Sequence, residues 1–249
     1  MNTSPPAHDF AKIRLFVETD LRVGEQFTLA DGQVHYLLNV MRQKEGDRVV
    51  LFNGRDGEWV VELCELKKKR GQARPLEQTR AQTPSPDLEL LFAPVKKLRL
   101  DFLVQKATEM GVSKVTPVQT QYTNAKVKET RIEANVIEAA EQSGRLDVPV
   151  VGETVKLADV LKDWPEGRRL LFCDEAEDAT PIKPALAAET SGQPWSILIG
   201  PEGGFAPQER TDLRAHKGAL AVSLGPRIMR ADTAALAALA VFQAELGDW

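Results

Sequence analysis

Two apolar runs in the last quarter of the chain each lead into a Gly-Pro pair, and no other feature constrains the fold as strongly. The first run, Ser196–Ile199, opens into Gly200–Phe205 (GPEGGF), and the second, Ala219–Leu224, opens into Gly225–Ala234 (GPRIMRADTA). A helical pattern separates them, which predicts two adjacent strand–loop–helix units. Ligands of open parallel sheets bind just beyond such strand ends. We therefore expect the two loops to form one small-molecule pocket.

The residues around the glycines narrow the kind of ligand. No Lys-Ser or Lys-Thr follows the first loop, which excludes a P-loop, and no G-x-G-x-x-G follows an early strand, which excludes a Rossmann cofactor site. The backbone groups of a tight loop suit hydrogen bonds to the edge of an adenine or a ribose. The alternative is that the glycines serve only the turn and that the loop binds no ligand. In the second loop, Arg230 precedes a helix whose first turn contains Asp232 and Thr233. Asp and Thr are common helix caps, but an arginine there is electrostatically disfavoured and therefore indicates an anionic partner or substrate.

Hydrophobic periodicity divides the chain into two domains, residues 1–80 and 81–249, with a polar linker at 82–87. The first domain is predicted to be rich in β structure, with one helix over 32–41 and strands at 14–17, 26–29, 48–53 and 58–66. For residues 71–80 the pattern is compatible with either a further strand or a loop. In the second domain, strands at 88–95, 114–118, 169–173, 196–199 and 219–224 alternate with helices at 97–110, 129–143, 157–161, 207–216 and 232–246. This alternation predicts a mostly parallel α/β sheet.

Composition restricts the remaining function classes. The chain of 249 residues is 43% hydrophobic and 27% charged, without a signal-peptide pattern or a run of transmembrane length, so we expect a cytoplasmic protein with no membrane segment. Cys64 and Cys173 are isolated, and no histidine has a neighbour at metal-ligand spacing, so neither a disulfide nor a metal site is expected. The net charge is −4, yet Lys67–Arg70 forms a basic run that is either a solvated strand edge or an RNA contact.

The paired loops resemble the signature of the RsmE family, the 16S ribosomal RNA (uracil-N3) methyltransferases of the SPOUT superfamily. The resemblance extends over most of the chain, in the same order, through R14-L-F-V17, H35-Y-L-L-N-V-M-R42, F52-N-G54, Q105-K-A-T-E-M-G-V112 and E138-A-A-E-Q-S-G-R145. The sequence departs from the family pattern at Asp232, where Glu is usual, and at Met229, where Leu is common. Gln121–Asn124 replaces a segment that is usually more basic and contains serine.

The resemblance implies an N-terminal PUA-like β-barrel followed by a C-terminal SPOUT α/β domain with a trefoil knot. It implies a homodimer that binds S-adenosyl-L-methionine and methylates 16S ribosomal RNA or the small ribosomal subunit. The residues that it assigns to the cofactor are Leu198, Ile199, Gly200, Pro201, Gly203, Gly204, Leu224, Gly225, Ile228, Met229, Thr233 and Ala234.

For catalysis, we expect Arg230 to stabilise the uracil anion, and Glu202 to act as a base or, more in keeping with a carboxylate in a glycine loop, to orient the loop or pair with an arginine. The candidate RNA-binding residues are Arg14, Arg42, Gln142, Arg145 and Arg227. Two alternatives remain at this point. One is a SPOUT enzyme that acts on another RNA or on a ribose 2′-hydroxyl, and the other is a ribosome-assembly factor that binds RNA without turnover.

Overall fold

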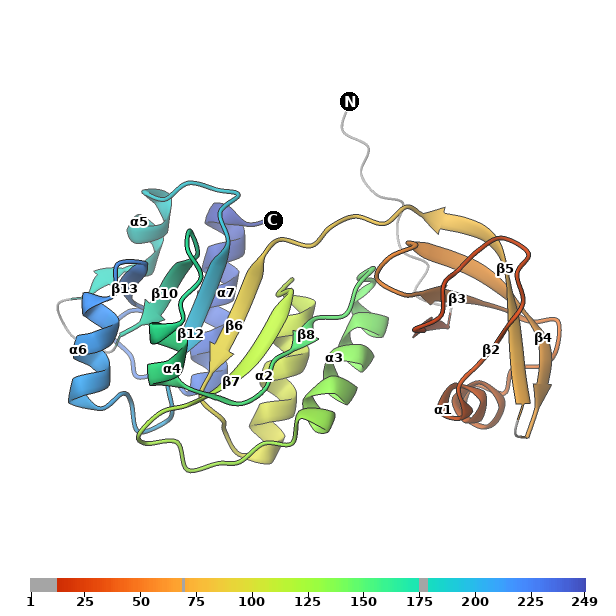
Figure 1. Ribbon diagram of the computed structural model, residues 1–249, viewed down its shortest axis with the longest axis horizontal. Coiled ribbons are helices and arrows are strands. Elements are labelled where there is room, and N and C mark those ends of the chain that lie inside the picture. The colour runs from red at the N-terminus through yellow and green to blue at the C-terminus, as the bar shows by residue number, and fades with distance from the viewer. Residues whose placement is uncertain (1–12, 69, 175–178) are drawn as a thin grey trace. The chain divides into compact units, whose positions relative to one another are not determined.

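The computed structural model describes residues 13–68, 70–174 and 179–249 (Figure 1). Contacts group these residues into two compact units. The N-terminal unit contains the described residues up to Pro84 together with Ala140–Val148, and the C-terminal unit contains Ser85–Ala139 and Pro149–Trp249. The sequence pattern gives no sign that residues 140–148 belong with the N-terminal unit.

A five-stranded sheet with strand order β1-β3-β4-β5-β2 forms the N-terminal unit. Its strands are β1 (Arg14–Phe16), β2 (Phe27–Thr28), β3 (Arg48–Phe52), β4 (Glu58–Lys67) and β5 (Arg70–Arg80). β1 runs parallel to β3, and the other neighbours are antiparallel. Alternating side chains from these strands bury one apolar core, which includes Leu15, Val49, Leu51, Val61 and Leu63.

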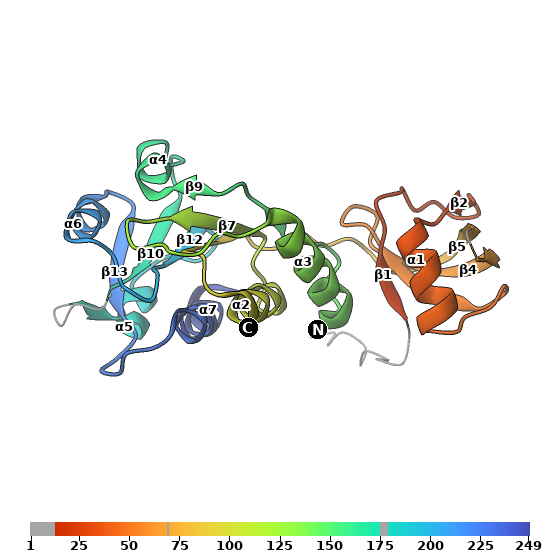
Figure 2. The ribbon, with the colours of Figure 1, turned by 90° about the horizontal axis from the view of Figure 1, so that it is seen from below.

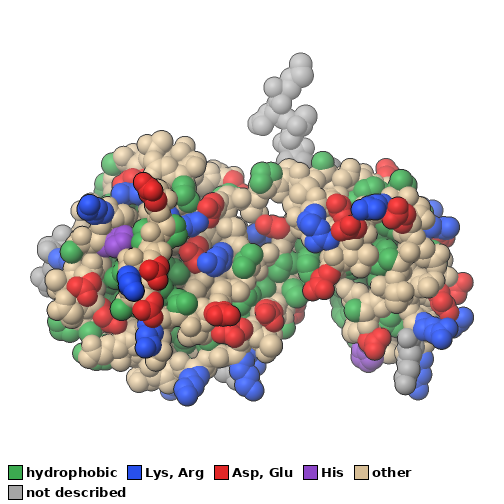
Figure 3. All heavy atoms as spheres, viewed as in Figure 1, with side chains coloured by type: hydrophobic (Ala, Val, Ile, Leu, Met, Phe, Trp, Pro, Cys, Tyr) green, Lys and Arg blue, Asp and Glu red, His purple; other side chains and the backbone are tan. Residues whose placement is uncertain are grey.

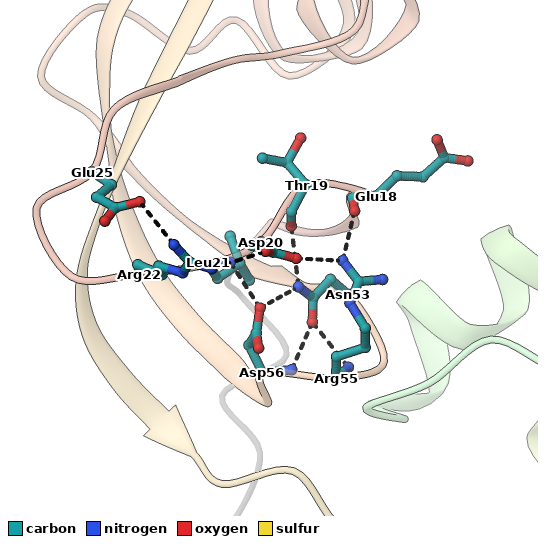
Figure 4. Close-up of polar contacts among 9 residues, drawn as sticks. All are labelled: Glu18, Thr19, Asp20, Leu21, Arg22, Glu25, Asn53, Arg55 and Asp56. Atoms are coloured by element: carbon teal, nitrogen blue, oxygen red, sulfur yellow. Dashed lines mark hydrogen bonds and ion pairs between the residues drawn. The ribbon is translucent and has the colours of Figure 1, made fainter.

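A polar network fixes the turn between β3 and β4 (Figure 4). The buried Asn53 donates to the Asp56 carboxylate at 2.6 Å and to the Thr19 carbonyl at 3.1 Å. Its own side-chain oxygen accepts the amides of Arg55 and Asp56 at 3.0 and 2.8 Å. Hydrogen bonds from the Leu21 amide and then from Asn53 lower the pKa of Asp56. The carboxylate therefore stays ionised at neutral pH and ties the turn to the segment after β1.

The predicted helix at 32–41 changes character halfway along. α1 (Asp31–His35) continues as a π-helical turn, η1 (Tyr36–Val40), in which the Met41 amide donates to the Tyr36 carbonyl at 2.9 Å. The wider turn ends at Arg42, whose φ of +54° is left-handed. Non-glycine residues rarely adopt this conformation, and both π turns and such outliers are frequent at functional positions.

The C-terminal unit contains a parallel sheet in the order β11-β13-β10-β12-β6-β7-β8, and β9 pairs with β7. The strands are β6 (Leu88–Phe92), β7 (Lys114–Gln119), β8 (Val150–Val151), β9 (Val155–Lys156), β10 (Arg169–Cys173), β11 (Thr180–Pro181), β12 (Trp195–Ile199) and β13 (Ala219–Ser223). Each pair within it is parallel. The predicted α/β alternation is therefore confirmed.

Helices cover both faces of this sheet (Figure 2). They are α2 (Lys97–Glu109), α3 (Glu129–Ser143), α4 (Leu157–Lys162), α5 (Ile182–Ala187), α6 (Pro207–Ala215) and α7 (Ala231–Leu246). α4 and α6 pack on one face, where Leu157 and Leu213 join a core with Leu91, Phe172 and Leu198. α2, α5 and α7 lie on the other face, where Trp195 meets Phe242 edge to face. None of the helices in the described part of the chain has the length and apolar character needed to cross a membrane.

A buried carboxylate joins three central strands. Glu89 of β6 is 8% exposed. It accepts hydrogen bonds from the hydroxyls of Thr116 on β7 at 2.7 Å and Ser196 on β12 at 2.9 Å. Lys114 lies 3.0 Å from the same carboxylate. A buried charge is tolerated in a sheet when its oxygens are satisfied in this way.

Candidate cofactor pocket

A pocket of about 830 Å³ lies at the carboxyl ends of β10, β12 and β13. Both glycine loops line it, together with the end of β10, β11 and the first turns of α2, α6 and α7. The volume is within the range of about 300–1,000 Å³ that is usual for small-molecule sites. The two loops therefore form one pocket, as the sequence predicts.

The first glycine loop folds back on itself after β12. The Gly204 amide donates to the Pro201 carbonyl at 2.9 Å, and Gly204 has a φ of +70°. This reversal brings the Phe205 ring over Gly200, where a Cβ would lie 2.7 Å from the ring. Phe205 is anchored in turn by an edge contact with Phe172 at 5.2 Å between centroids. The glycines are required because the loop must bend sharply and pack against an aromatic ring.

The second glycine loop leads from β13 into α7. Gly225 adopts a φ of +104°, and a Cβ there would meet no atom within 4 Å. The backbone at this point is thus open to the pocket. Arg230 occupies the N-cap position of α7 and has no side-chain cap hydrogen bond, and its side chain lines the pocket. Asp232 instead accepts the amide of Thr233 at 3.1 Å.

The acidic groups of the pocket are all compensated by arginines. Glu202 pairs with Arg99 in the first turn of α2. The Asp174 carboxylate, whose side chain is 1% exposed, lies 3.3 Å from Arg210 Nε and 2.7 Å from Arg214 Nε on α6. Over the described residues, by contrast, Arg227 and Arg230 form no ion pair. The open side of the pocket therefore favours an anionic or electron-rich group.

Sequence reasoning missed several lining residues, namely Arg99, Cys173, Asp174, Ala179, Pro181, Phe205, Arg210, Ser223, Pro226 and Ala231. Five of them, Arg99, Cys173, Asp174, Ala179 and Pro181, are far from the glycine loops in sequence, and only the folded sheet brings them to the pocket. Burial raises the pKa of the Cys173 thiol to about 12, so this group is a neutral part of the wall. Within residues 13–68, 70–174 and 179–249, no cluster of three or more potential metal ligands is found.

Most of the predicted cofactor residues line the pocket, along with Glu202, Arg227 and Arg230. Three predicted residues do not. Leu198 is fully buried in β12, and Thr233 lies on the exposed side of α7. Gly203 is exposed, and its missing Cβ would lie 3.5 Å from Cβ of Tyr122 instead of in the pocket.

The remaining predicted RNA-binding residues belong to the N-terminal unit. Arg14 is 11% exposed and is used internally, since it pairs with Glu58 at 2.8 Å and donates to the carbonyls of Ala140 and Arg145. Arg145 is 10% exposed and pairs with Asp147 at 3.0 Å. Arg42 is exposed at the end of the π turn.

Gln142 is also exposed, near the end of α3. Of the basic run Lys67–Arg70, Lys69 lies outside the described residues, and Lys67 pairs with Glu65 at 3.0 Å. On the face of each unit that Figure 3 shows, acidic and basic side chains are interspersed instead of segregated.

Comparison with known proteins identifies relatives of both units. A family model described as an RNA methyltransferase domain matches residues 82–243, and one described as an RNA methyltransferase PUA domain matches residues 29–76. The ribosomal RNA small subunit methyltransferase E of Rickettsia conorii is 32% identical over 229 residues, which cover 91% of this chain and 93% of the relative. That of Bacillus subtilis is 29% identical over 250 residues, with 94% and 97% covered.

Solved structures agree with these relatives. The ribosomal RNA small subunit methyltransferase E from Neisseria gonorrhoeae, bound to S-adenosyl methionine, has a TM-score of 0.86 at 30% identity and covers 96% of this chain and 99% of that chain. A putative methyltransferase from Legionella pneumophila, in complex with the same cofactor, has a TM-score of 0.83 at 28% identity, with the same coverage. The predicted combination of a C-terminal α/β methyltransferase domain with an N-terminal PUA-like domain is confirmed. The chain belongs to the ribosomal RNA small subunit methyltransferase E family.

Proposed function

We propose that this protein transfers the methyl group of S-adenosyl-L-methionine to N3 of a uracil in the 16S ribosomal RNA of the small subunit. The observation that carries the proposal is the two-loop pocket, whose open side holds Arg227 and Arg230 with no carboxylate partner among the described residues. The names of the relatives and the cofactor bound in the two solved structures support the reaction and the cofactor.

The pocket fits the cofactor in size and chemistry. Its volume of about 830 Å³ suits a ligand with a nucleoside and an amino-acid part. Ile199, Leu224 and Met229 offer apolar surface for an adenine ring, and the backbone of the glycine loops offers hydrogen bonds to its edge. The space beside Gly225, where a Cβ would meet nothing within 4 Å, leaves room for a ligand against the backbone.

The chain's part of the reaction is to make uracil N3 nucleophilic. The bound cofactor supplies an activated methyl group on a sulfonium centre with a neutral leaving group. Uracil N3 carries a proton, and the anion left when solvent water takes this proton spreads charge over O2 and O4. We infer that Arg230, which lines the pocket at the positive end of α7, stabilises that charge. Glu202, which is paired with Arg99 and half exposed, orients Arg99 and the glycine loop.

We assign residues 1–80 to an RNA-holding PUA-like domain and residues 81–249 to the methyltransferase domain. Arg42, Gln142 and Arg227 are exposed and available for RNA. Arg14 and Arg145, which are mostly buried and internally paired, support the RNA-binding surface by fixing its shape. RNA affinity should fall steeply with salt, as expected for contacts to phosphates.

A homodimer in the cytoplasm is part of this proposal. The C-terminal unit leaves large apolar side chains exposed, with Leu98 at 85%, Phe102 at 43% and Ile228 at 93%. Leu98 and Phe102 lie one turn apart on α2, and a second copy of the chain would cover such a face. Leu98→Glu should shift the protein to monomers in sedimentation velocity. An unchanged mass would exclude this face as the interface.

The reaction is tested with purified protein, labelled cofactor and small ribosomal subunits from a strain that lacks the protein. Incorporation of label, together with mass spectrometry that locates 3-methyluridine in the 16S RNA, is the expected result. Label at a ribose 2′-hydroxyl or in another RNA would assign a different target. Binding of RNA and cofactor without transfer would mean a ribosome-assembly factor.

The role of Arg230 is separable from cofactor binding. Arg230→Ala should lower kcat by about 100-fold or more with little change in cofactor affinity, as expected for a group that acts on transition-state charge. Arg227→Ala is the matched variant at the same loop, and it should raise the KM for RNA more than it lowers kcat. A collapse of cofactor binding in Arg230→Ala would make Arg230 a cofactor residue.

A further inference from the structure

Tyr122 exposes an aromatic ring at the edge of the sheet where the cofactor pocket lies. It belongs to the loop between β7 and α3, and 41% of its surface is exposed. The tyrosine hydroxyl has no hydrogen-bond partner in the described part of the chain. This loop is also where Gln121–Asn124 departs from the more basic family pattern. The core does not account for the ring, so its surface is available for a ligand.

The loop holds Tyr122 in a defined position. A turn closes over residues 120–123, in which the Thr123 amide donates to the Thr120 carbonyl at 3.1 Å. The Thr123 hydroxyl accepts the Thr120 amide at 3.0 Å and lies 2.9 Å from the Thr120 hydroxyl. The Gln121 amide donates to Glu209 on α6 at 2.8 Å. The backbone at Tyr122 is therefore preorganised, and only the side chain would have to be ordered when a ligand binds.

Tyr122 borders the first glycine loop directly. A Cβ on Gly203 would lie 3.5 Å from Tyr122 Cβ and 4.0 Å from its Cγ. The residues on either side, Glu202 and Gly204, line the cofactor pocket. The ring thus lies on the outer side of the same loop. Arg227 and Arg230 follow β13, which β10 separates from β12, and they line the same pocket as that loop.

We propose that Tyr122 stacks on an unpaired base of the substrate RNA at the entrance to the cofactor pocket. The proposal rests on the RNA methylation proposed above and adds a base-binding residue to it. RNA sequences are read on unpaired bases that stack on aromatic side chains, and a base must leave its helix to reach an enclosed active site. Arginines for phosphates and a ring for a base are the combination that single-stranded RNA requires.

Two substitutions distinguish the contribution of the ring to RNA binding from that of the hydroxyl. Tyr122→Leu removes the aromatic face and keeps apolar bulk, whereas Tyr122→Phe keeps the face. Trp249→Leu removes another exposed aromatic ring, 67% exposed, at the end of the chain and serves as the control. RNA from undermethylated small subunits is the ligand, and cofactor affinity is measured in parallel.

Tyr122→Leu should weaken RNA binding by about 10-fold, within the range found for one base stacked on an aromatic side chain. Tyr122→Phe and Trp249→Leu should bind RNA as the wild type does, and all variants should bind the cofactor equally. RNA that carries 2-aminopurine beside the methylated position should lose fluorescence on the wild type and Tyr122→Phe but not on Tyr122→Leu.

Equal RNA binding by wild type and Tyr122→Leu would overturn the proposal. Equal losses in Tyr122→Phe and Tyr122→Leu would also overturn it, because the hydroxyl would then be the contact. A change of sedimentation mass in Tyr122→Leu would assign the ring to a subunit interface instead. If the wild type binds RNA but transfers no methyl group, the proposed reaction is refuted and the proposed stacking is not, because stacking is measured through RNA binding.

Discussion

Replacing Arg14 with methionine tests whether this residue serves the fold of the N-terminal unit. Its side chain is 11% exposed and pairs with Glu58 at 2.8 Å. Its terminal nitrogens donate to the carbonyls of Ala140, at 2.9 Å, and Arg145. Its guanidinium carbon also lies 3.9 Å from the centre of the Phe52 ring. Methionine keeps much of the apolar stem but removes every donor.

The structure sets the size of the expected loss. Removing one member of a buried ion pair costs about 3–5 kcal/mol, because the other charge remains buried. Glu58 keeps the Thr79 hydroxyl at 2.9 Å and Arg80 at 3.6 Å. The unit should therefore lose about 3 kcal/mol, the lower end of that range. Arg14→Met combined with Glu58→Leu should recover most of it, since an apolar replacement of a whole buried pair is often neutral.

The loss should depend on pH through Glu58. Burial lowers the pKa of Arg14 and by itself would raise that of Glu58, but hydrogen bonds from Arg14 and Thr79 outweigh it and lower the pKa of Glu58 below its usual 4.5. The lowered pKa of Glu58 indicates that its charged form is favoured in the pair, whereas the lowered pKa of Arg14 indicates that the charged form of Arg14 is disfavoured. Glu58 decides the pH dependence, because a guanidinium stays protonated throughout the working range. Its stabilisation is complete above about pH 4.5 and is lost as the pH falls through the lowered folded value, so wild type and variant should converge in acid.

Hydrogen exchange read by mass spectrometry measures this effect, because it resolves the two units separately. Amides of β3 and β4 should exchange faster in Arg14→Met, while those of the C-terminal unit should not change. Arg22→Met is the matched control, since Arg22 is 65% exposed and its ion pairs with Asp20 and Glu25 lie on the surface. Unchanged exchange together with weakened RNA binding in Arg14→Met would refute the reasoning and make Arg14 a direct RNA contact.

Three further predictions concern the pocket. Gly225→Ala should weaken cofactor binding by about 10-fold, because a φ of +104° is costly for alanine, whereas Gly192→Ala, at +83° in equally open space outside the pocket, should leave the calorimetric Kd unchanged. Asp174→Asn should destabilise the C-terminal unit by about 2 kcal/mol, since two partly exposed arginines lose their charged hydrogen-bond acceptor, and an unchanged melting temperature would contradict this. Cys173 is partly exposed in the pocket wall, but its pKa is raised to about 12, so it should react slowly with alkylating reagents in the native protein and faster after denaturation, and equal rates by mass spectrometry would contradict the raised pKa.

The sequence predicted the long periodic elements and missed those that depend on tertiary contacts. Helices at 97–110, 129–143 and 207–216 are confirmed with small differences at their ends. α5 was missed because Pro181 and Pro184 lie at its start, where proline is tolerated although it breaks longer helices. β5, with Gly71 and Pro75, has low strand propensity and forms because it pairs along β4.

The site was predictable as far as it is local in sequence. The glycine loops and Arg230 follow strand ends, and their approach follows from a parallel sheet. The pairing of Arg99 with Glu202, and of two α6 arginines with Asp174, depends on which strands are neighbours, which periodicity does not give. Neither could burial of Arg14 be predicted, since its partners Ala140 and Arg145 lie more than a hundred residues along the chain.

The carboxylate of Glu89 has a consequence for the alignment of the strands. A slip of β12 by one residue would turn Ser196 to the opposite face and bring Trp195 or Ile197 against a buried charge. A similar slip of β7 would remove Thr116 and Lys114 together. One acidic residue therefore penalises misregistered versions of three strands at once. Because Ser196 follows Glu89 by 107 positions, the carboxylate gains this partner only when two distant segments of the chain meet.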